Sequence, residues 1–266
     1  MVRVGLVGCG TIGSRVAQAL HRKYAKTARI TALHDSNPAH ATSLQRRLTP
    51  RPRILPLESL IRRSDLIIEA ASPAIAGPLV GRALRANRDI LVMSVGGLLG
   101  GGWKKHLRGS RGRLLIPSGA LAGLDGVKAL AVGRLRRVSL TTRKPPRALA
   151  DAPYVRRRGL RLERLARARV IFEGSPRAAV GAFPQNINIA AALALASGSS
   201  ARARIRVVAD PSITRNMHEL DVEGDCGRIR CRIESRPSAN PKTSELAVRS
   251  AIAALGRFFD TVTIGT

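Results

Sequence analysis

The chain has 266 residues and a formal net charge of +29, from 46 lysines and arginines against 17 acidic residues. Its longest purely apolar stretch, Ile189 to Ala196, is far shorter than the roughly 20 residues that cross a bilayer. The three cysteines form no C-x-x-C pair, so neither a disulfide framework nor a metal site is expected. We expect a cytoplasmic protein without membrane contact, built as one or two compact domains.

The strong positive charge raises the question of nucleic-acid binding, because a basic surface attracts phosphate backbones. The arginines are spread from Arg3 to Arg257, and one Trp, two Tyr and four Phe are the only aromatic residues available to stack on bases. We interpret most of the excess as solvated surface that also attracts an anionic cofactor and substrate. A nucleic-acid interface is not the expected role.

The N-terminal segment joins a strand to a glycine turn and a helix. Val2 to Val7 is an apolar run of strand length, and Ile12 to Lys26 carries apolar residues at helical spacing. Between them, Gly-x-Gly-x-x-Gly provides a tight turn, a close backbone approach to a pyrophosphate, and close packing of helix on strand. We therefore expect a dinucleotide cofactor to contact Gly8, Gly10, Thr11, Ile12 and Gly13.

An acidic residue follows the second expected strand. Arg29 to His34 ends in Asp35, which lies 22 positions after Gly13. This is near the spacing at which a carboxylate binds the adenosine ribose hydroxyls of NAD. Arg46 and Arg47 lie close in sequence and would suit a 2′-phosphate, so NADP remains open as the cofactor.

The following residues alternate between strands and helices. Asp65 to Ala70 and Asp89 to Ser94 are near-continuous apolar runs, as expected for strands buried on both faces of a parallel sheet. A helical stretch begins at Pro73 between them, and Leu114 to Ile116 offers a further strand. This α/β order predicts a Rossmann-type doubly wound parallel sheet in residues 1–117.

Two loops follow the carboxyl ends of these strands, where such sheets bind their ligands. Ala71 and Ser72 come after the first apolar run, and Ser94 to Gly97 after the next. We expect cofactor contacts from Ala71 and Ser72. Capping of a helix is an equally suitable role for Ser72 and Ser94.

After Pro117 the pattern changes to helical stretches interspersed with alternating strands, which predicts a second, α+β domain in residues 118–240. The expected strands are residues 137–142, 170–173, 204–209, 217–222 and 228–234. The last two would form an antiparallel pair across residues 223–227, a connection rich in turn residues.

The alternation within this pair separates two faces. Glu219 and Asp221 fall on the same side as the arginines of the second strand, so acids and arginines can pair in water. His218 is in phase with Leu220 and Val222. We therefore expect His218 to point into the protein, toward a core or a cleft.

Several further motifs occur in order along the chain. They are Pro-Ser-Gly-Ala-Leu-Ala-Gly-Leu-Asp-Gly at 117–126, Thr-Thr-Arg-Lys-Pro-Pro at 141–146, Phe-Pro-Gln-Asn-Ile-Asn at 183–188, Asp-Pro-Ser-Ile-Thr-Arg-Asn-Met-His at 210–218 and Ser-Ala-Asn-Pro-Lys-Thr-Ser at 238–244. With the glycine motif, they make the chain resemble the L-aspartate dehydrogenase family from end to end.

The resemblance implies roles for particular residues. His218 matches the catalytic histidine of the family, and Ala122 and Asn188 match residues that contact the nicotinamide cofactor. It also implies a homodimer and a last helix, 241–259, that returns to the cofactor domain, which would then comprise residues 1–117 and 241–266. One departure is the stretch Gly96 to Gly102, which is richer in glycine than expected.

The implied reaction is reversible oxidative deamination of L-aspartate to oxaloacetate and ammonia through iminoaspartate, with pyridine nucleotide biosynthesis as its implied destination and either direction open. With an ordinary pKa of about 6.5, His218 can act as general base on the attacking water and return the proton. The two substrate carboxylates need basic or polar partners. Lys144 is the first candidate and Thr214 with Arg215 the second, and a purely structural role remains open for each.

Two alternatives remain open. A related reductase of the dihydrodipicolinate reductase or homoserine dehydrogenase type would keep the glycine motif with a different polar set in the second domain. A non-enzymatic basic nucleotide- or nucleic-acid-binding protein could have kept the same fold, because fold does not fix function.

Overall fold

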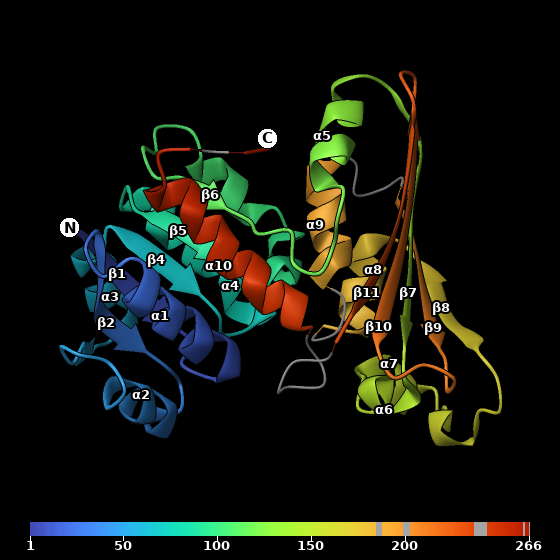
Figure 1. Ribbon diagram of the computed structural model, residues 1–266, viewed down its shortest axis with the longest axis horizontal. Coiled ribbons are helices and arrows are strands. Elements are labelled where there is room, and N and C mark those ends of the chain that lie inside the picture. The colour runs from blue at the N-terminus through green and yellow to red at the C-terminus, as the bar shows by residue number, and fades with distance from the viewer. Residues whose placement is uncertain (185–187, 199–202, 237–243, 263, 266) are drawn as a thin grey trace. The chain divides into compact units, whose positions relative to one another are not determined.

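The computed structural model describes residues 1–184, 188–198, 203–236, 244–262 and 264–265 (Figure 1). The chain divides into two compact units, Met1–Pro117 with Val248–Thr263 and Ser118–Ala247 with Ile264–Thr266. The expected boundary between residues 240 and 241 lies outside the described residues. Within the described ranges, no helix is long and apolar enough to span a bilayer.

The first unit is built on a six-stranded sheet in the order β3-β2-β1-β4-β5-β6, and all of its pairings are parallel. This confirms the expected Rossmann-type sheet, and the apolar runs are buried in it as predicted. The strands are β1 (Val2–Val7), β2 (Ala28–His34), β3 (Arg53–Ile54), β4 (Leu66–Glu69), β5 (Asp89–Val92) and β6 (Leu114–Leu115).

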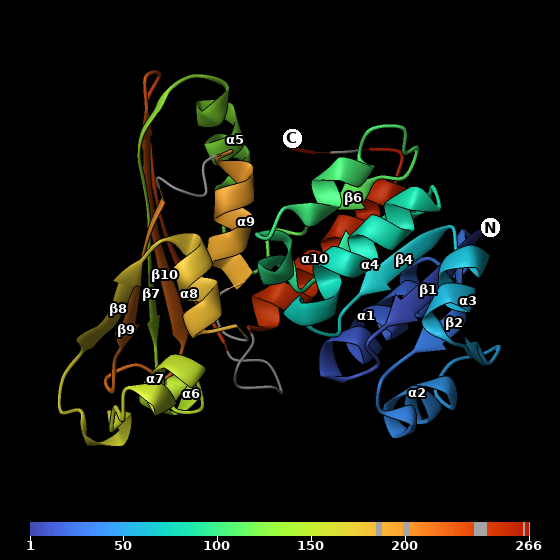
Figure 2. The ribbon, with the colours of Figure 1, turned by 180° about the vertical axis from the view of Figure 1, so that it is seen from behind.

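Helices cover both faces of this sheet, with α1 and α10 over one face and α4 over the other (Figures 1 and 2). The packing of α10 against α1 places Ala251 and Leu255 in one core cluster with Val16 and Leu20. The helices are α1 (Thr11–Lys23), α2 (Pro38–Gln45), α3 (Leu57–Arg63), α4 (Pro73–Arg85) and α10 (Glu245–Phe259), with 3-10 turns η1 (Val95–Leu98) and η2 (Gly102–His106).

Helix α1 ends earlier than the sequence pattern suggested. It was expected to reach Lys26 but stops at Lys23, because the carbonyl of Tyr24 accepts the N–H groups of both Thr27 and Ala28 and turns the chain into β2. The last helix begins at Glu245, and residues 241–243 of its expected start lie outside the described residues.

The second unit has a five-stranded mixed sheet in the order β11-β10-β7-β9-β8. Strands β7 and β9 are parallel, and the other neighbours are antiparallel. Helices line one side of the sheet (Figure 2), which confirms the α+β class. The strands are β7 (Leu135–Lys144), β8 (Arg169–Gly174), β9 (Ala203–Ala209), β10 (Asn216–Gly224) and β11 (Arg228–Ser235). The helices are α5 (Leu124–Val132), α6 (Pro146–Leu149), α7 (Pro153–Arg157), α8 (Pro176–Ala182) and α9 (Asn188–Ala196), with the 3-10 turn η3 (Leu162–Arg164).

The β10–β11 hairpin forms with the expected division of faces. Asp221 lies opposite Arg230, and its carboxylate accepts hydrogen bonds from Arg228 and Arg137. The Arg228 hydrogen bonds are the main reason why the pKa of Asp221 falls to about 2. On the other face Leu220 and Val222 are buried. The hairpin therefore turns its charged ladder outward and its other face toward the core.

Candidate active site

The glycine turn of the first unit has the space and geometry that a dinucleotide needs. Gly8 has a left-handed backbone with φ of 93°, and a Cβ at this position would collide with the backbone of Ala70. A Cβ on Gly13 would overlap the carbonyl oxygen of Gly8, whereas one on Gly10 would meet nothing within 4 Å. The turn is therefore closed on its inner side and open in front of the N-terminus of α1, where backbone N–H groups can receive a pyrophosphate.

Asp35 lies at the end of β2 beside this turn, at the predicted position. Its Oδ2 accepts the backbone N–H of Cys9 at 2.6 Å, and its Oδ1 accepts the N–H of Asn37 at 2.8 Å. The carboxylate thus joins the glycine turn to the loop before α2. Contact of Asp35 with a ribose remains a prediction.

Glu69 is a buried acid that the sequence reasoning missed. It ends β4 with a fully buried side chain, and its two oxygens accept the backbone N–H groups of Ala71 at 2.8 Å and Ser94 at 2.9 Å. Burial raises the pKa of this carboxyl, and the backbone hydrogen bonds oppose that rise. Glu69 therefore ties together two predicted ligand-edge loops, with Ala71 exposed and Ser72 half-buried beside it. An acid at the last position of an apolar strand was the available signal.

In the second unit, polar residues gather at one end of the sheet's inner face. Strand β7 buries Thr142 and Lys144, and β10 buries Asn216 and His218. The two strands are antiparallel neighbours with His218 opposite Thr142. We call these four residues the polar end of the sheet. The structure thus brings the predicted catalytic histidine and the first predicted substrate residue into one cluster.

Burial sets the charge states in the polar end. It lowers the pKa of the Lys144 ammonium to about 8. Burial, followed by repulsion from Lys144, lowers the pKa of His218 to about 3. His218 is therefore neutral near pH 7, while most of Lys144 remains protonated. The expected inward orientation of His218 is confirmed by its 2% exposure, but its pKa lies well below the ordinary value used for the sequence-based mechanism.

Asn216 is the second residue that the sequence reasoning did not single out. Its side chain is 1% exposed, and within the described part of the chain neither its Nδ2 nor its Oδ1 has a hydrogen-bond partner. An unpaired buried amide costs about 1–3 kcal/mol. Its position two residues before His218 on the same face of β10 was the available signal. Among the described residues, both the NH2 group and the carbonyl oxygen of Asn216 are therefore unused in the polar end.

The other predicted residues are not all joined to this cluster. Thr214 and Arg215 are exposed in the loop between β9 and β10, and no described contact links them to the polar end. Ala122 is exposed before α5, and Asn188 is half-buried as the first residue of α9. Residues 185–187 of the Phe-Pro-Gln-Asn-Ile-Asn motif lie outside the described residues, as do residues 238–243 of the last motif.

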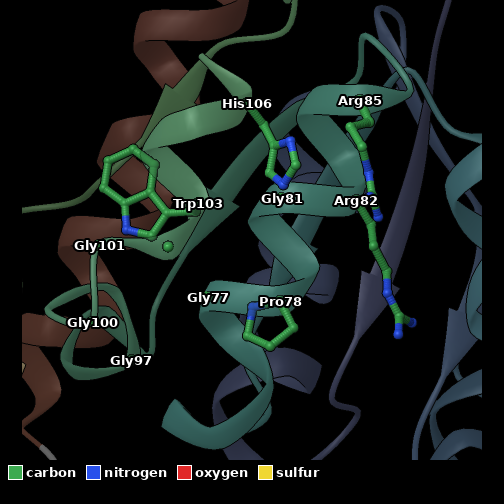
Figure 3. Close-up of a pocket in the computed structure, with 11 residues that line it drawn as sticks. Gly77, Pro78, Gly81, Arg82, Arg85, Gly97, Gly100, Gly101, Trp103 and His106 are labelled. Atoms are coloured by element: carbon green, nitrogen blue, oxygen red, sulfur yellow. The ribbon is translucent and has the colours of Figure 1, made fainter.

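The glycine-rich stretch 96–102 borders a cavity of about 380 Å³ against α4 in the first unit (Figure 3). Gly97 is the one residue of the two predicted ligand-edge loops that lines it. A Cβ on Gly97 would overlap the carbonyl oxygen of Pro73, at the start of α4. Part of the unexpected glycine content is therefore explained by close packing of the loop on α4.

Comparison with family models gives one match in each unit, although the second match continues through α10, which packs in the first unit. Residues 8–110 match the model described as homoserine dehydrogenase, NAD binding domain. Residues 125–258 match the model described as aspartate dehydrogenase, C-terminal. The fold and the site define a dehydrogenase that uses a nicotinamide dinucleotide.

Individual relatives match over the whole length. The L-aspartate dehydrogenase of Methanosarcina acetivorans is 42% identical over 272 residues, with all of both chains covered. That of Bradyrhizobium diazoefficiens is 36% identical and covers all of this chain and 94% of its own. The crystal structure of aspartate dehydrogenase from Thermotoga maritima shares the fold, with a TM-score of 0.73 at 23% identity and full coverage of both chains. The chain belongs to the L-aspartate dehydrogenase family, which confirms the resemblance of its motifs.

Proposed function

We propose that this protein converts L-aspartate, water and NAD⁺ or NADP⁺ to oxaloacetate, ammonium and the reduced cofactor, with release of a proton. Membership of the family supports this reaction. The structural observation that carries it is the meeting of His218 with Lys144 in the buried polar end of the second unit. The cation can bind a carboxylate of L-aspartate. The neutral base can accept a proton from the water that adds to the imine formed from it.

Lys144 binds one substrate carboxylate. Burial of its ammonium is costly, and an arriving carboxylate offsets that cost while raising the pKa of Lys144 above about 8. Asn216 offers a neutral donor and acceptor at the same end of the sheet. Its Nδ2 can donate to a carboxylate, while its Oδ1 can accept from the substrate amino group. The substrate thus provides partners for the Asn216 amide, which has none among the described residues.

His218 moves protons in the hydrolytic half of the reaction. When bound, the oxidised cofactor would accept the hydride that leaves the substrate Cα. His218 accepts a proton from the water that adds to the Cα of iminoaspartate, then returns it to the nitrogen as ammonia leaves. A pKa of about 3 makes free His218 a weak base. The negative charge of the bound dicarboxylate offsets the repulsion from Lys144 and raises that pKa toward the working range.

Two broader features belong to the same proposal. We infer a homodimer, supported by the family resemblance and by the open edge of the sheet at strand β11. Light scattering of the purified protein tests this, and a monomer mass would contradict it. We also propose that iminoaspartate made here feeds pyridine nucleotide biosynthesis, which only the resemblance supports.

The reaction is tested by following nicotinamide reduction with L-aspartate and either cofactor, beside D-aspartate, L-glutamate and L-homoserine. We expect turnover confined to L-aspartate and lost in His218→Gln, with His21→Gln at an exposed position of α1 as the matched control. Turnover on L-homoserine alone would indicate the related reductase. Absence of turnover in both directions, with salt-sensitive retention on DNA, would indicate the binding protein instead.

A further inference from the structure

The cavity between α4 and the glycine-rich stretch 96–102 is not used by the proposed reaction (Figure 3). Its volume of about 380 Å³ is within the range of small-molecule pockets. It is lined on one side by α4 and on the other by the segment from Gly97 to His106. Among the described residues that line it, none belongs to the glycine turn 8–13 or to the polar end of the second unit.

Glycines make much of the cavity wall bare backbone. Gly77 and Gly81 lie one turn apart on the side of α4 that faces the cavity. A Cβ on Gly77 would come within 2.9 Å of the carbonyl oxygen of Gly97, and one on Gly81 within 2.9 Å of the His106 ring. By contrast, a Cβ on Gly100 would meet nothing within 4 Å. The loop therefore packs closely on α4 at two points and leaves room beside them.

The cavity has a positively charged rim. Arg82 and Arg85 line it from the last turn of α4, and both are exposed. Nη1 of Arg82 lies 3.1 Å from Oε1 of Glu58, so the charge of Arg82 is partly offset. In the described part of the chain, no carboxylate lies within ion-pair distance of Arg85. Arg85 is therefore the cation that an incoming anion can bind, and its planar guanidinium suits bidentate binding of a carboxylate.

His106 supplies an aromatic surface beside this rim. Its imidazole lies over Gly81, between η2 and α4 (Figure 3). Partial burial lowers the pKa of His106, and repulsion from Arg85 and Lys105 lowers it further. The ring is therefore neutral near pH 7 and adds no charge of its own. A neutral ring beside bare backbone can pack against the flat face of an aromatic ligand, and a guanidinium can stack on the same kind of face.

We propose that this cavity binds a small aromatic carboxylate, with the carboxylate on Arg85 and the ring against His106 and the glycine backbone of α4. All of its lining residues belong to the first unit. Because it uses no residue of the glycine turn or of the polar end, such a ligand and the cofactor should bind at the same time. The inference goes beyond the proposed function and does not depend on it.

The test measures binding of 2-naphthoate to the full-length protein by calorimetry, at constant ionic strength and without cofactor or amino acid. We expect a dissociation constant on the order of 10 to 500 μM. Arg85→Ala should weaken binding about tenfold or more, because a hydrogen-bonded charge partner is lost. Arg63→Ala is the matched control, because Arg63 is the exposed last residue of α3, as Arg85 is of α4, and does not line the cavity. No binding by the wild type, or equal weakening in both variants, would overturn the proposal.

Changes to the ligand separate the contribution of the ring from that of the charge. 2-Naphthol lacks the carboxylate, and decahydronaphthalene-2-carboxylate lacks the aromatic ring. Each should bind about fivefold more weakly than 2-naphthoate, or weaker still. Inorganic sulfate at the same concentration should displace little, because it has no ring. A saturated analogue that binds as tightly as 2-naphthoate, or equal competition by sulfate, would show that the cavity recognises only negative charge and would overturn the proposal.

Trp103 reports where the ligand binds. It is the one tryptophan of the chain, it lines the cavity, and its Nε1–H donates to the carbonyl of Leu98 at 2.8 Å. Its single indole N–H signal in the NMR spectrum should shift when 2-naphthoate is added, and saturating NADH should not displace the ligand. An unshifted indole signal, or displacement by NADH, would place the ligand elsewhere and overturn the proposal. Because no step involves turnover, a failure of the aspartate reaction would be recognised separately.

Discussion

The hydroxyl of Thr142 and Nδ1 of His218 lie 3.3 Å apart across the paired strands β7 and β10. Both side chains are buried, so the contact fixes the plane of the imidazole and occupies one of its two nitrogens. Nε2 is then the nitrogen left for the reacting water. For Nε2 to accept the proton of that water, the ring proton must be on Nδ1, which then donates to the hydroxyl oxygen of Thr142.

Thr142→Val should lower kcat for L-aspartate by about three- to tenfold, which corresponds to the loss of one neutral hydrogen bond. The dissociation constant of the cofactor should not change. Steady-state kinetics with calorimetry of NADH binding measure both. Thr141→Val is the control, because Thr141 lies opposite Glu219 on the other face of the sheet. An equal fall of kcat in both variants would argue against orientation of His218 by Thr142.

Lys144→Met should make the protein more stable and less active. The folded-state pKa of Lys144, about 8, lies below its ordinary value of 10.5. Between these pH values the unfolded chain binds more protons than the folded one, so Lys144 makes the free energy of unfolding rise with pH. Below pH 8 the full cost of burying the ammonium lowers that free energy. Urea unfolding should show a gain on the order of 1–3 kcal/mol at pH 7 and a flatter profile between pH 8 and 10.5.

The same variant tests the substrate role of Lys144. The KM for L-aspartate should rise about tenfold or more, because a charge-assisted hydrogen bond to a carboxylate is lost. A more stable Lys144→Met protein with unchanged KM would place Lys144 in the fold alone. Unchanged stability at pH 7 with an unchanged pH profile would show that the ammonium is not penalised by burial.

Much of the first unit could be predicted because its signals are local. The strand, the glycine turn and Asp35 follow one another within a single βαβ segment, and each apolar run corresponds to a buried strand. The hairpin faces of β10 and β11 were predictable for the same reason, since period-2 alternation fixes which side each residue occupies. The inward orientation of His218 could therefore be predicted from the alternation alone.

The polar end could not be assembled from the sequence. Strand β7 lies between β10 and β9, both of which come much later in the chain, and packing of distant segments determines such pairings. The pKa values of Lys144 and His218 depend on how deeply that packing buries them. Glu69 was not predicted, because in the sequence it is a single acidic residue within an apolar run. The two backbone N–H groups that its carboxylate accepts become visible only in the structure.

Asn216→Leu should be tolerated by the fold but not by the substrate site. Replacing a buried amide without partners by an apolar side chain of similar size removes a desolvation cost, so the free energy of unfolding should stay equal or rise by about 1–2 kcal/mol. The KM for L-aspartate should rise several-fold at the same time. Thermal unfolding with saturating L-aspartate should then show a smaller stabilisation than in the wild type. A marked loss of stability in the free variant would instead show that Asn216 makes structural contacts.

Glu69→Gln should loosen the two ligand-edge loops of the first unit. The substitution keeps the shape of the side chain, but an amide nitrogen cannot accept, so the N–H of either Ala71 or Ser94 loses its acceptor. We expect a loss of about 1–3 kcal/mol in unfolding free energy, together with several-fold weaker NADH binding by calorimetry. Glu58→Gln is the matched control, because Glu58 is exposed and pairs only with Arg82 among the described residues, and it should change stability by less than about 0.5 kcal/mol. Equal effects of the two variants would show that the hydrogen bonds of Glu69 matter neither for the fold nor for the cofactor. A Glu69→Gln protein that loses stability but keeps its NADH affinity would leave Glu69 a role in the fold alone.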